Sequence, residues 1–310
     1  MKKRFFTLAL ALALILSLSS CGSSDSPASS SNENVTVIEA PSKETEAPTV
    51  PLSDSGELGQ LEVSIGDLEH IQDYDGNPAI LIHFTFTNNS EENQSAMFSL
   101  AYKAFQNGIG LEDAFIMDES IHSSDDLMKE IQPGTTIELT KAYALSSDTA
   151  PVEFYVSEAI SFDDAKLGKI FEIATGGTTV FSVAPGLESA TEIGDYLVSI
   201  NSYDIAEDYD GNPALVLNMG YTNNSNVDSP FYVALEVKAF QDGIELEKAY
   251  FVDNTVVDDS GNYLNVLPGA GLGVAEAFIL TSDTSPVDIE IAEFFSFNDE
   301  KITTQINLTE

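Results

Sequence analysis

A two-residue period of apolar and polar positions dominates the chain from about residue 60 onward. Between residues 80 and 86, isoleucine or phenylalanine occupies every second position, and the alternation recurs within 63–65, 98–104, 137–145 and 152–156. Turn-forming pairs such as Asn-Gly, Asp-Gly and Pro-Gly separate these runs. Such alternation is typical of half-buried antiparallel strands. Because we find no long amphipathic helical pattern, the sequence predicts an all-β fold.

The strand pattern occurs twice. The segment Asp73–Ala79 recurs unchanged as Asp208–Ala214, at an offset of 135 residues that also relates the two copies of TNNS, KAFQ and PG. Aligned without a gap, 39 of the 106 positions from 61 to 166 are identical to those from 196 to 301. This period is too long for a solenoid repeat and fits a complete domain. About seven short strands per copy predict two tandem immunoglobulin-like antiparallel β-sandwich domains.

The composition divides the chain into five segments. We predict a lipoprotein signal peptide (1–20), a disordered tether rich in Ser, Pro, Glu and Thr (21–56), a first β-sandwich domain (57–175), a linker (176–192) and a second β-sandwich domain (193–310). The tether has no sustained apolar period and therefore cannot bury enough surface to fold.

The N-terminus has the features of a bacterial lipoprotein signal. Three basic residues at positions 2–4 precede an apolar run, Phe5 to Leu16, that is too short to span a bilayer. Positions 18–21 then read Leu-Ser-Ser-Cys, the order of a lipobox. Because Cys21 is the only cysteine, we interpret it as the lipidated residue rather than as a nucleophile. Two acyl chains give stable anchoring, so we expect the protein at the extracellular face of the cell membrane.

The lipobox, the tether and several repeated segments resemble those of a known family. The segments are DYDGNPA, TNNS, KAFQDGIELE (Lys238–Glu247) and SDTSPV (Ser282–Val287). They are similar to an uncharacterised family of immunoglobulin-like domains on lipoproteins of Gram-positive bacteria. The resemblance covers both repeats and implies the fold and the location. It implies no catalytic residues, because the family is one of unknown function.

The charge balance excludes some classes of partner. The chain has 12 Lys and Arg against 51 Asp and Glu, for a formal net charge of −39. A nucleic-acid binder needs a basic surface, and a polybasic contact with anionic lipid is equally disfavoured. An acidic surface favours cationic partners such as Ca²⁺ or basic peptides and proteins, although solubility explains the acidity as well. Apart from calcium, we predict no cofactor.

The repeated turn offers oxygen atoms at alternate positions, which is the ligand pattern of hard cations. The candidate metal ligands are Asp73, Asp75, Asn77, Asp208, Asp210 and Asn212. The loop is not an EF-hand, because Pro78 stands where that loop needs Gly and Phe84 where it needs a bidentate Glu. A tight turn, in which Asp and Gly adopt left-handed geometry, explains the same residues. We favour the turn and keep a calcium site as the alternative, with Asp125-Asp126 and Asp258-Asp259 as possible helpers.

Two charged pairs are a second candidate. In the alternation of their strands, Glu158 and Glu293 occupy positions that would face inward. Lys141 and its counterpart Glu276 occupy positions of neighbouring strands where the alternation calls for an apolar residue. One interpretation pairs Lys141 with Glu158, and Glu276 with Glu293. The other, which we favour, leaves these groups in water at bulges or strand ends.

The sequence contains no catalytic signature. Phosphate-binding glycine loops, HExxH, GxSxG and SxxK are absent. Histidine occurs only at His70, His83 and His122, and the second copy has Ile, Asn and Val at these places. Three histidines that the sister domain lacks are a weak catalytic set.

We therefore predict a non-enzymatic, membrane-anchored binding, adhesion or accessory module whose ligand and oligomeric state the sequence does not identify. One alternative is a calcium-binding surface module. Another is a cell-envelope enzyme, which a polar cleft in only one copy would favour. An exposed aromatic patch would favour an accessory role, with Met97 and Phe105, or Phe231 and Tyr232, as the places to look.

Overall fold

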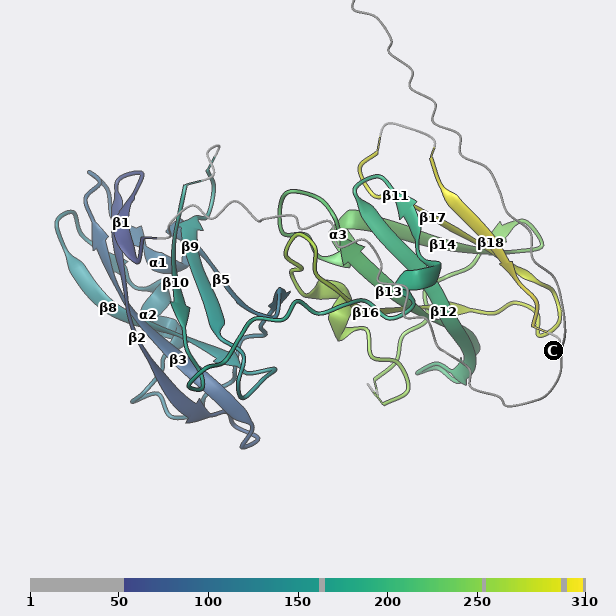
Figure 1. Cartoon of the computed structure of the whole chain (residues 1–310), viewed down its shortest axis with the longest axis horizontal. Helices are drawn as coiled ribbons and strands as arrows, with labels where there is room; N and C mark the ends of the chain where they lie inside the picture. Colours follow the sequence, from purple (N-terminus) through teal and green to yellow (C-terminus); the bar gives the residue numbers. More distant parts are fainter. Residues whose placement is uncertain (1–52, 162–164, 253–254, 297–299, 309–310) are drawn as a thin grey trace, which may run out of the picture. The chain divides into compact units, whose positions relative to one another are not determined.

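The computed structural model describes residues 53–161, 165–252, 255–296 and 300–308. The predicted signal peptide, the lipidation site Cys21 and nearly all of the predicted tether lie outside these residues. In the part of the chain that is described, no helix is long and apolar enough to cross a membrane. The described residues form two β-sandwiches, which we call sandwich 1 and sandwich 2 (Figure 1).

Sandwich 1 consists of two four-stranded antiparallel sheets. The first has the order β1 (Ser55–Leu58), β2 (Leu61–Gln72), β3 (Pro78–Asn88) and β8 (Thr136–Ala144). The second has the order β10 (Lys166–Phe171), β9 (Val152–Glu158), β5 (Leu100–Gln106) and β6 (Ile109–Gly110). Smaller elements are the paired strands β4 (Gln94–Ser95) and β7 (Glu130–Ile131), and the helices α1 (Ala96–Ser99) and α2 (Ser124–Met128).

Sandwich 2 repeats this topology. Its first sheet has the order β11 (Thr191–Ile193), β12 (Tyr196–Glu207), β13 (Pro213–Asn223) and β16 (Gly271–Ile279). Its second sheet has the order β15 (Ile244–Glu245), β14 (Leu235–Gln241), β17 (Val287–Glu293) and β18 (Ile302–Ile306). The short helices are η1 (Leu187–Ser189), α3 (Phe231–Ala234) and η2 (Ser260–Tyr263). The predicted tandem all-β fold is confirmed.

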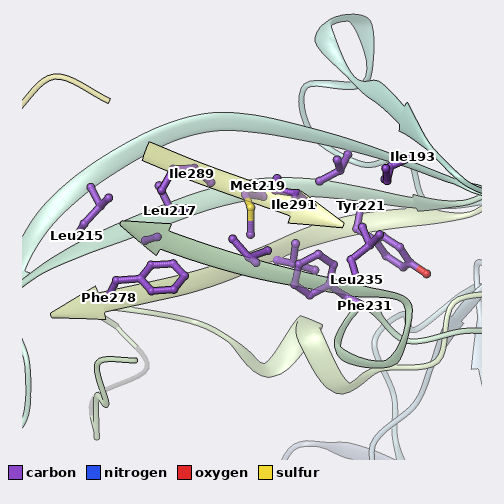
Figure 2. Packing of buried hydrophobic residues seen from close by; sticks show 14 of the residues in the cluster. Ile193, Leu215, Leu217, Met219, Tyr221, Phe231, Leu235, Phe278, Ile289 and Ile291 are labelled. Carbon is purple, nitrogen blue, oxygen red and sulfur yellow. The ribbon is translucent and has the colours of Figure 1, made fainter. Parts of the chain in front are cut away.

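The inward face of each alternating strand forms the core. In sandwich 1, Ile80, Ile82, Phe84 and Phe86 of β3 are all buried in one cluster with residues of β9 and β5. Figure 2 shows the matching cluster of sandwich 2, where Leu217, Met219 and Tyr221 of β13 pack with Ile289 and Ile291 of β17. Burial of such side chains stabilises the fold by roughly 1.5–3 kcal/mol each.

One predicted strand begins later than the alternation indicates. The pattern over 98–104 places Phe98 inward, but residues 96–99 form the one-turn helix α1, and Phe98 is 77% exposed. The strand β5 begins only at Leu100. A single helical turn is too short to impose a recognisable 3.6-residue period, so the sequence offered no sign of it.

The residues that are identical in both copies include buried amides that join loops. Gln106 is buried and donates from Nε2 to the carbonyl oxygens of Ser147 (3.0 Å) and Ala150 (2.7 Å). Its Oε1 accepts from the backbone N–H groups of Ser146 and Ser147, both at 3.0 Å. Gln241 makes the same bonds in sandwich 2. This network explains why KAFQ and SDT recur, because a buried amide must be satisfied.

A second buried amide explains the repeated TNNS and PG motifs. The Nδ2 of Asn88 donates to the carbonyl oxygens of Glu92 (2.8 Å) and Ile131 (3.0 Å), and its Oδ1 accepts from Ser90. The backbone N–H of Gly134 donates to the carbonyl oxygen of Asn88 at 2.7 Å. Asn223 repeats the side-chain bonds. These motifs are therefore structural.

Candidate functional site

The repeated turn closes on itself through its first aspartate. Asp73 Oδ1 accepts from the backbone N–H of Asn77 at 2.7 Å, and Oδ2 accepts from Asn77 Nδ2 at 3.1 Å. Asp208 and Asn212 form the same two bonds at the same distances. The hydrogen bond from the Asn77 backbone lowers the pKa of Asp73, because it stabilises the carboxylate. Gly76 supplies the left-handed position with φ of +86°.

These contacts account for Asp73, Asn77, Asp208 and Asn212 without a metal. Across the described residues, no group of three or more His, Cys, Asp or Glu is placed to hold a metal ion. Two of the four proposed helpers have local partners, since Asp126 pairs with Lys129 and Asp258 accepts from Ser260. The tight turn that we favoured is present, although its left-handed positions are Gly76 and Gly211 and none of its aspartates has a positive φ. Calcium binding stays the alternative, as a prediction.

The turn holds an exposed tyrosine beside a second aromatic ring. The backbone N–H of Tyr74 donates to the carbonyl oxygen of Phe115 at 2.9 Å, and the two ring centroids lie 5.9 Å apart at 71°. In sandwich 2, the backbone N–H of Tyr209 donates to the carbonyl oxygen of Tyr250, also at 2.9 Å. All four side chains are exposed. The DYDGN motif therefore positions an aromatic side chain at the surface in each copy.

A hollow of about 420 Å³ adjoins this pair in sandwich 1. Met97 of α1, Phe115 and Met117 line it together with Asp113 and Lys141. The segment around Asp113 runs beside β8, because the backbone N–H of Ala114 donates to the carbonyl oxygen of Ala142 at 3.1 Å. Lys141 Nζ therefore reaches Asp113 Oδ1 at 2.9 Å, although the lysine side chain is only 16% exposed.

Sandwich 2 has tyrosines at the corresponding positions. Tyr232 of α3 and Tyr263 of η2 lie with ring centroids 5.2 Å apart. Partial burial raises the pKa of Tyr263, with smaller contributions from Asp259, Glu276 and the neighbouring Tyr232 and Tyr250. At the offset of 135 residues, Tyr209, Tyr232, Tyr250 and Tyr263 of sandwich 2 correspond to Tyr74, Met97, Phe115 and Met128 of sandwich 1.

We define two aromatic surfaces from these residues. Aromatic surface 1 consists of Tyr74, Met97, Phe115 and Met128, and aromatic surface 2 of Tyr209, Tyr232, Tyr250 and Tyr263. Every one of these eight side chains is at least 40% exposed. Of the positions that we singled out for a patch, Met97 and Tyr232 belong to these surfaces, whereas Phe105 and Phe231 are buried in the cores.

A second hollow, of about 460 Å³, contains two of the histidines. His83 and His122 line it together with Glu119, Glu138 and Thr140. His122 Nδ1 lies 2.8 Å from Thr140 Oγ1. Desolvation lowers the pKa of His122, and the nearby Lys141 lowers it further. In sandwich 2, Val257 takes the place of His122 and is buried against Val216, Ala275 and Ala277.

Comparison with known proteins identifies the family. The family described as Domain of unknown function (DUF5067) matches residues 37–158 and 188–293. The chain belongs to this family. The two matched segments of this DUF5067 protein contain most of sandwich 1 and of sandwich 2, so the predicted uncharacterised domain in tandem is confirmed. No curated protein matches the chain.

Solved structures give only a distant likeness. An NMR structure of a protein from Enterococcus faecalis is 22% identical and has a TM-score of 0.30, covering 39% of this chain and 90% of that one. The crystal structure of an exo-chitosanase, CsxA, from Amycolatopsis orientalis is 12% identical and has a TM-score of 0.23, covering 77% of this chain and 26% of that one.

The inward pairs of charges, which were the interpretation that we did not favour, do not form in this DUF5067 chain. Lys141 pairs with Asp113, and Glu276 pairs with Lys248. Glu158 and Glu293 belong to β9 and β17, in the opposite sheets of their sandwiches. Each is partly exposed at the end of its strand, as we favoured. The same interpretation was wrong for Lys141 and Glu276, which lie within β8 and β16 and whose side chains are largely covered and ion-paired. Sequence parity could not identify Asp113 as a partner, because this residue lies outside the regular strands.

Proposed function

We propose that this DUF5067 protein is a membrane-tethered, non-enzymatic binding module in which each sandwich presents one aromatic surface to a partner. The observation that carries this proposal is the repetition of exposed apolar side chains at equivalent positions in both copies. Large exposed apolar groups cost solubility, and gathered groups of this kind mark interaction sites. Aromatic side chains and methionine are enriched at protein interfaces.

The pattern of identity between the copies supports the same conclusion. Identical residues include the buried amides Gln106 and Asn88 and the turn residues Asp73 and Asn77, which have structural partners. The aromatic surfaces instead keep their apolar character while their residues differ, apart from the shared tyrosine of the turn. The ring of Phe115 contacts Tyr74, which is itself exposed. A contact with another molecule is therefore the simplest reason for an exposed aromatic side chain at Phe115 and at Tyr250.

The membrane tether is proposed from the N-terminal sequence. The lipobox that ends at Cys21 supports acylation of this residue and attachment to the outer face of the membrane of a Gram-positive bacterium. Substitution Cys21→Ser should abolish incorporation of labelled palmitate and release the protein into the medium. Unchanged labelling and unchanged membrane retention of the variant would contradict the tether.

Site-specific photo-crosslinking in cells tests the binding proposal. We would place benzoylphenylalanine at Tyr74 or Tyr209, within the aromatic surfaces, and at Ile170 or Ile244 as controls, which are exposed but lie outside them. We expect the same adduct from both tyrosine positions and none from the controls. Adducts of equal yield at all four positions, or at none, would contradict a partner at these surfaces.

A catalytic role for the second hollow is the other candidate function. A hydroxyl in contact with an imidazole is the first element of a nucleophilic pair, and Thr140 and His122 provide it in sandwich 1 alone. Hydrolysis of p-nitrophenyl acetate measures such an activity. The test variants are His122→Val and Thr140→Ala, which insert the residues that sandwich 2 has at these positions. If both leave the rate unchanged, this candidate is wrong.

A further inference from the structure

We propose that the aromatic surfaces bind a basic protein segment that carries apolar side chains between its lysines or arginines. This inference rests on the proposed function and names the chemical class of the partner. Three observations carry it: the shape and apolar lining of the surface, the charges that surround it, and its presence in two copies.

The apolar part of the surface can accept side chains. In sandwich 1, Met97, Phe115 and Met117 line a hollow of about 420 Å³, next to the exposed ring of Tyr74. Methionine adapts to varied apolar partners. In sandwich 2, Tyr232 and Tyr263 present their rings at 45° to each other. Exposed tyrosines provide large contact area at low cost in side-chain entropy. Apolar side chains of a partner would therefore be buried on either surface.

The carboxylates of the surface outnumber its available cations. The hollow of sandwich 1 is lined by Asp113, Glu119 and Asp125, and its lining contains a single lysine, Lys141. This lysine is already paired with Asp113, and its Nζ lies 5.4 Å from the ring centroid of Tyr143. Among the described residues, Glu119 and Asp125 have no ion-pair partner. A lysine or arginine of a partner would supply one.

Sandwich 2 repeats this imbalance with different residues. Lys248, which stands at the position of Asp113, pairs with Glu276 and lies over the ring of Phe278, with Nζ 4.2 Å from the ring centroid. Asp259 is close enough to Tyr263 to affect its pKa. Asp208 and Asp210 flank Tyr209 in the turn, and neither forms an ion pair within the described residues. Both surfaces therefore combine aromatic contact area with unpaired negative charge.

The same charges argue against other occupants. An anionic bilayer or a nucleic acid would be repelled by these carboxylates and by a chain of net charge −39. A calcium ion alone would leave the apolar side chains exposed. A basic segment with apolar residues satisfies both parts of the surface, and two surfaces on one chain allow avidity for a partner that has two such segments.

Binding of defined peptides tests the inference. The protein is a soluble form that begins at Gly22 and keeps every described residue. The probe is a fluorescein-labelled peptide of four Arg-Phe-Lys-Leu repeats, and fluorescence anisotropy measures its affinity. Control peptides replace Arg and Lys with Glu, or Phe and Leu with Ser. We expect binding of the first peptide only, with an affinity that falls as salt is added.

Substitutions locate the binding surface. Tyr74→Ser and Phe115→Ser, combined in one chain with Tyr209→Ser and Tyr250→Ser, should weaken binding by at least about tenfold, which is typical for the loss of aromatic contacts at an interface. The matched controls Ile170→Ser and Ile244→Ser should leave it unchanged. Glu119→Gln with Asp125→Asn should weaken binding and reduce its salt dependence. Circular dichroism would check that each variant is folded.

Several outcomes would overturn the inference. These are equal binding of the peptide without Phe and Leu, equal loss in the Ile170 and Ile244 variants, or binding of phosphatidylglycerol vesicles in place of the peptide. If no peptide binds while cells still give crosslinks from Tyr74 and Tyr209, the class of partner is wrong and the proposed function stands. If the crosslinks also fail, the proposed function is wrong.

Discussion

Lys141 Nζ lies 2.9 Å from Asp113 Oδ1, and the same two positions of sandwich 2 hold this ion pair with its charges exchanged. There Glu276 replaces Lys141, and Lys248 replaces Asp113. The pair is therefore maintained as a unit, because either exchange alone would have placed two like charges together. In both copies it joins an irregular segment that carries part of an aromatic surface to a strand of the first sheet.

Charge reversal should show this coupling. In sandwich 1, Lys141→Glu faces Asp113 with a second carboxylate, and we expect a loss of about 1–2 kcal/mol in the free energy of unfolding. Asp113→Lys together with Lys141→Glu recreates the arrangement of sandwich 2 and should recover most of that loss. Urea denaturation of the two single variants and the double variant measures the coupling. Strictly additive effects would show that the two residues do not interact.

The hydroxyl of Tyr143 should lower the free energy of unfolding. It is buried in the core of sandwich 1 and has no hydrogen-bond partner in the described part of the chain. The equivalent residue of sandwich 2 is Phe278. Tyr143→Phe removes an unsatisfied polar group and should raise the free energy of unfolding by about 1 kcal/mol. The control is Tyr221→Phe, which breaks the bond from Tyr221 to the carbonyl oxygen of Ser229 and should destabilise. A destabilised Tyr143→Phe variant would indicate a hidden partner.

Acid should destabilise sandwich 1 through His122. Its pKa lies below the usual value of 6.5 in the folded state, first because of desolvation and then because of Lys141. Between the folded and the unfolded pKa, the unfolded chain binds more protons, so stability falls as the pH drops below 6.5. His122→Val should flatten the dependence of the melting temperature on pH between about 5 and 7. His70→Ile, which also inserts the residue of sandwich 2, serves as the control. An unchanged slope in His122→Val would contradict this assignment.

Calcium should leave thermal stability unchanged. Both carboxylate oxygens of Asp73 and of Asp208 already accept hydrogen bonds within the turn. A ligand that binds the native state raises its stability by RT ln(1 + [L]/Kd), so melting in excess EDTA and in millimolar calcium is a direct test. An upward shift with calcium that Asp75→Ala and Asp210→Ala remove would make the turn a metal site.

The strands and the duplication could be predicted from the sequence because both depend on regular spacing. The apolar residues at every second position of 80–86 predict the strand β3 and its inward face, and the repeated motifs predict the second sandwich. The surface could be predicted only in part. Met97 and Tyr232 were identified as candidates, but the neighbours of Tyr74 were not, because Phe115 reaches it through an irregular segment that has no hydrophobic period.

The buried residue Phe105 of β5 shows a different limit. Parity assigns a residue to a face, but it does not say whether that face is covered by loops. Phe105 is buried although it lies on the face of β5 opposite to that of the inward residue Ala104. The ring centroids of Phe105 and Tyr155 lie 5.9 Å apart. Burial on both faces of a strand depends on long-range packing that no local pattern records.

The buried side-chain amides of Gln106 and Gln241 hydrogen-bond the loops that contain Ala150 and Ser285. The aromatic surfaces lie on other segments. The framework and the variable side chains can therefore change independently. After the duplication, the surface of either copy was free to accumulate substitutions without loss of the buried framework. The methionines of one surface and the tyrosines of the other are what such divergence would leave, so one tethered chain presents two different contact surfaces to the same partner.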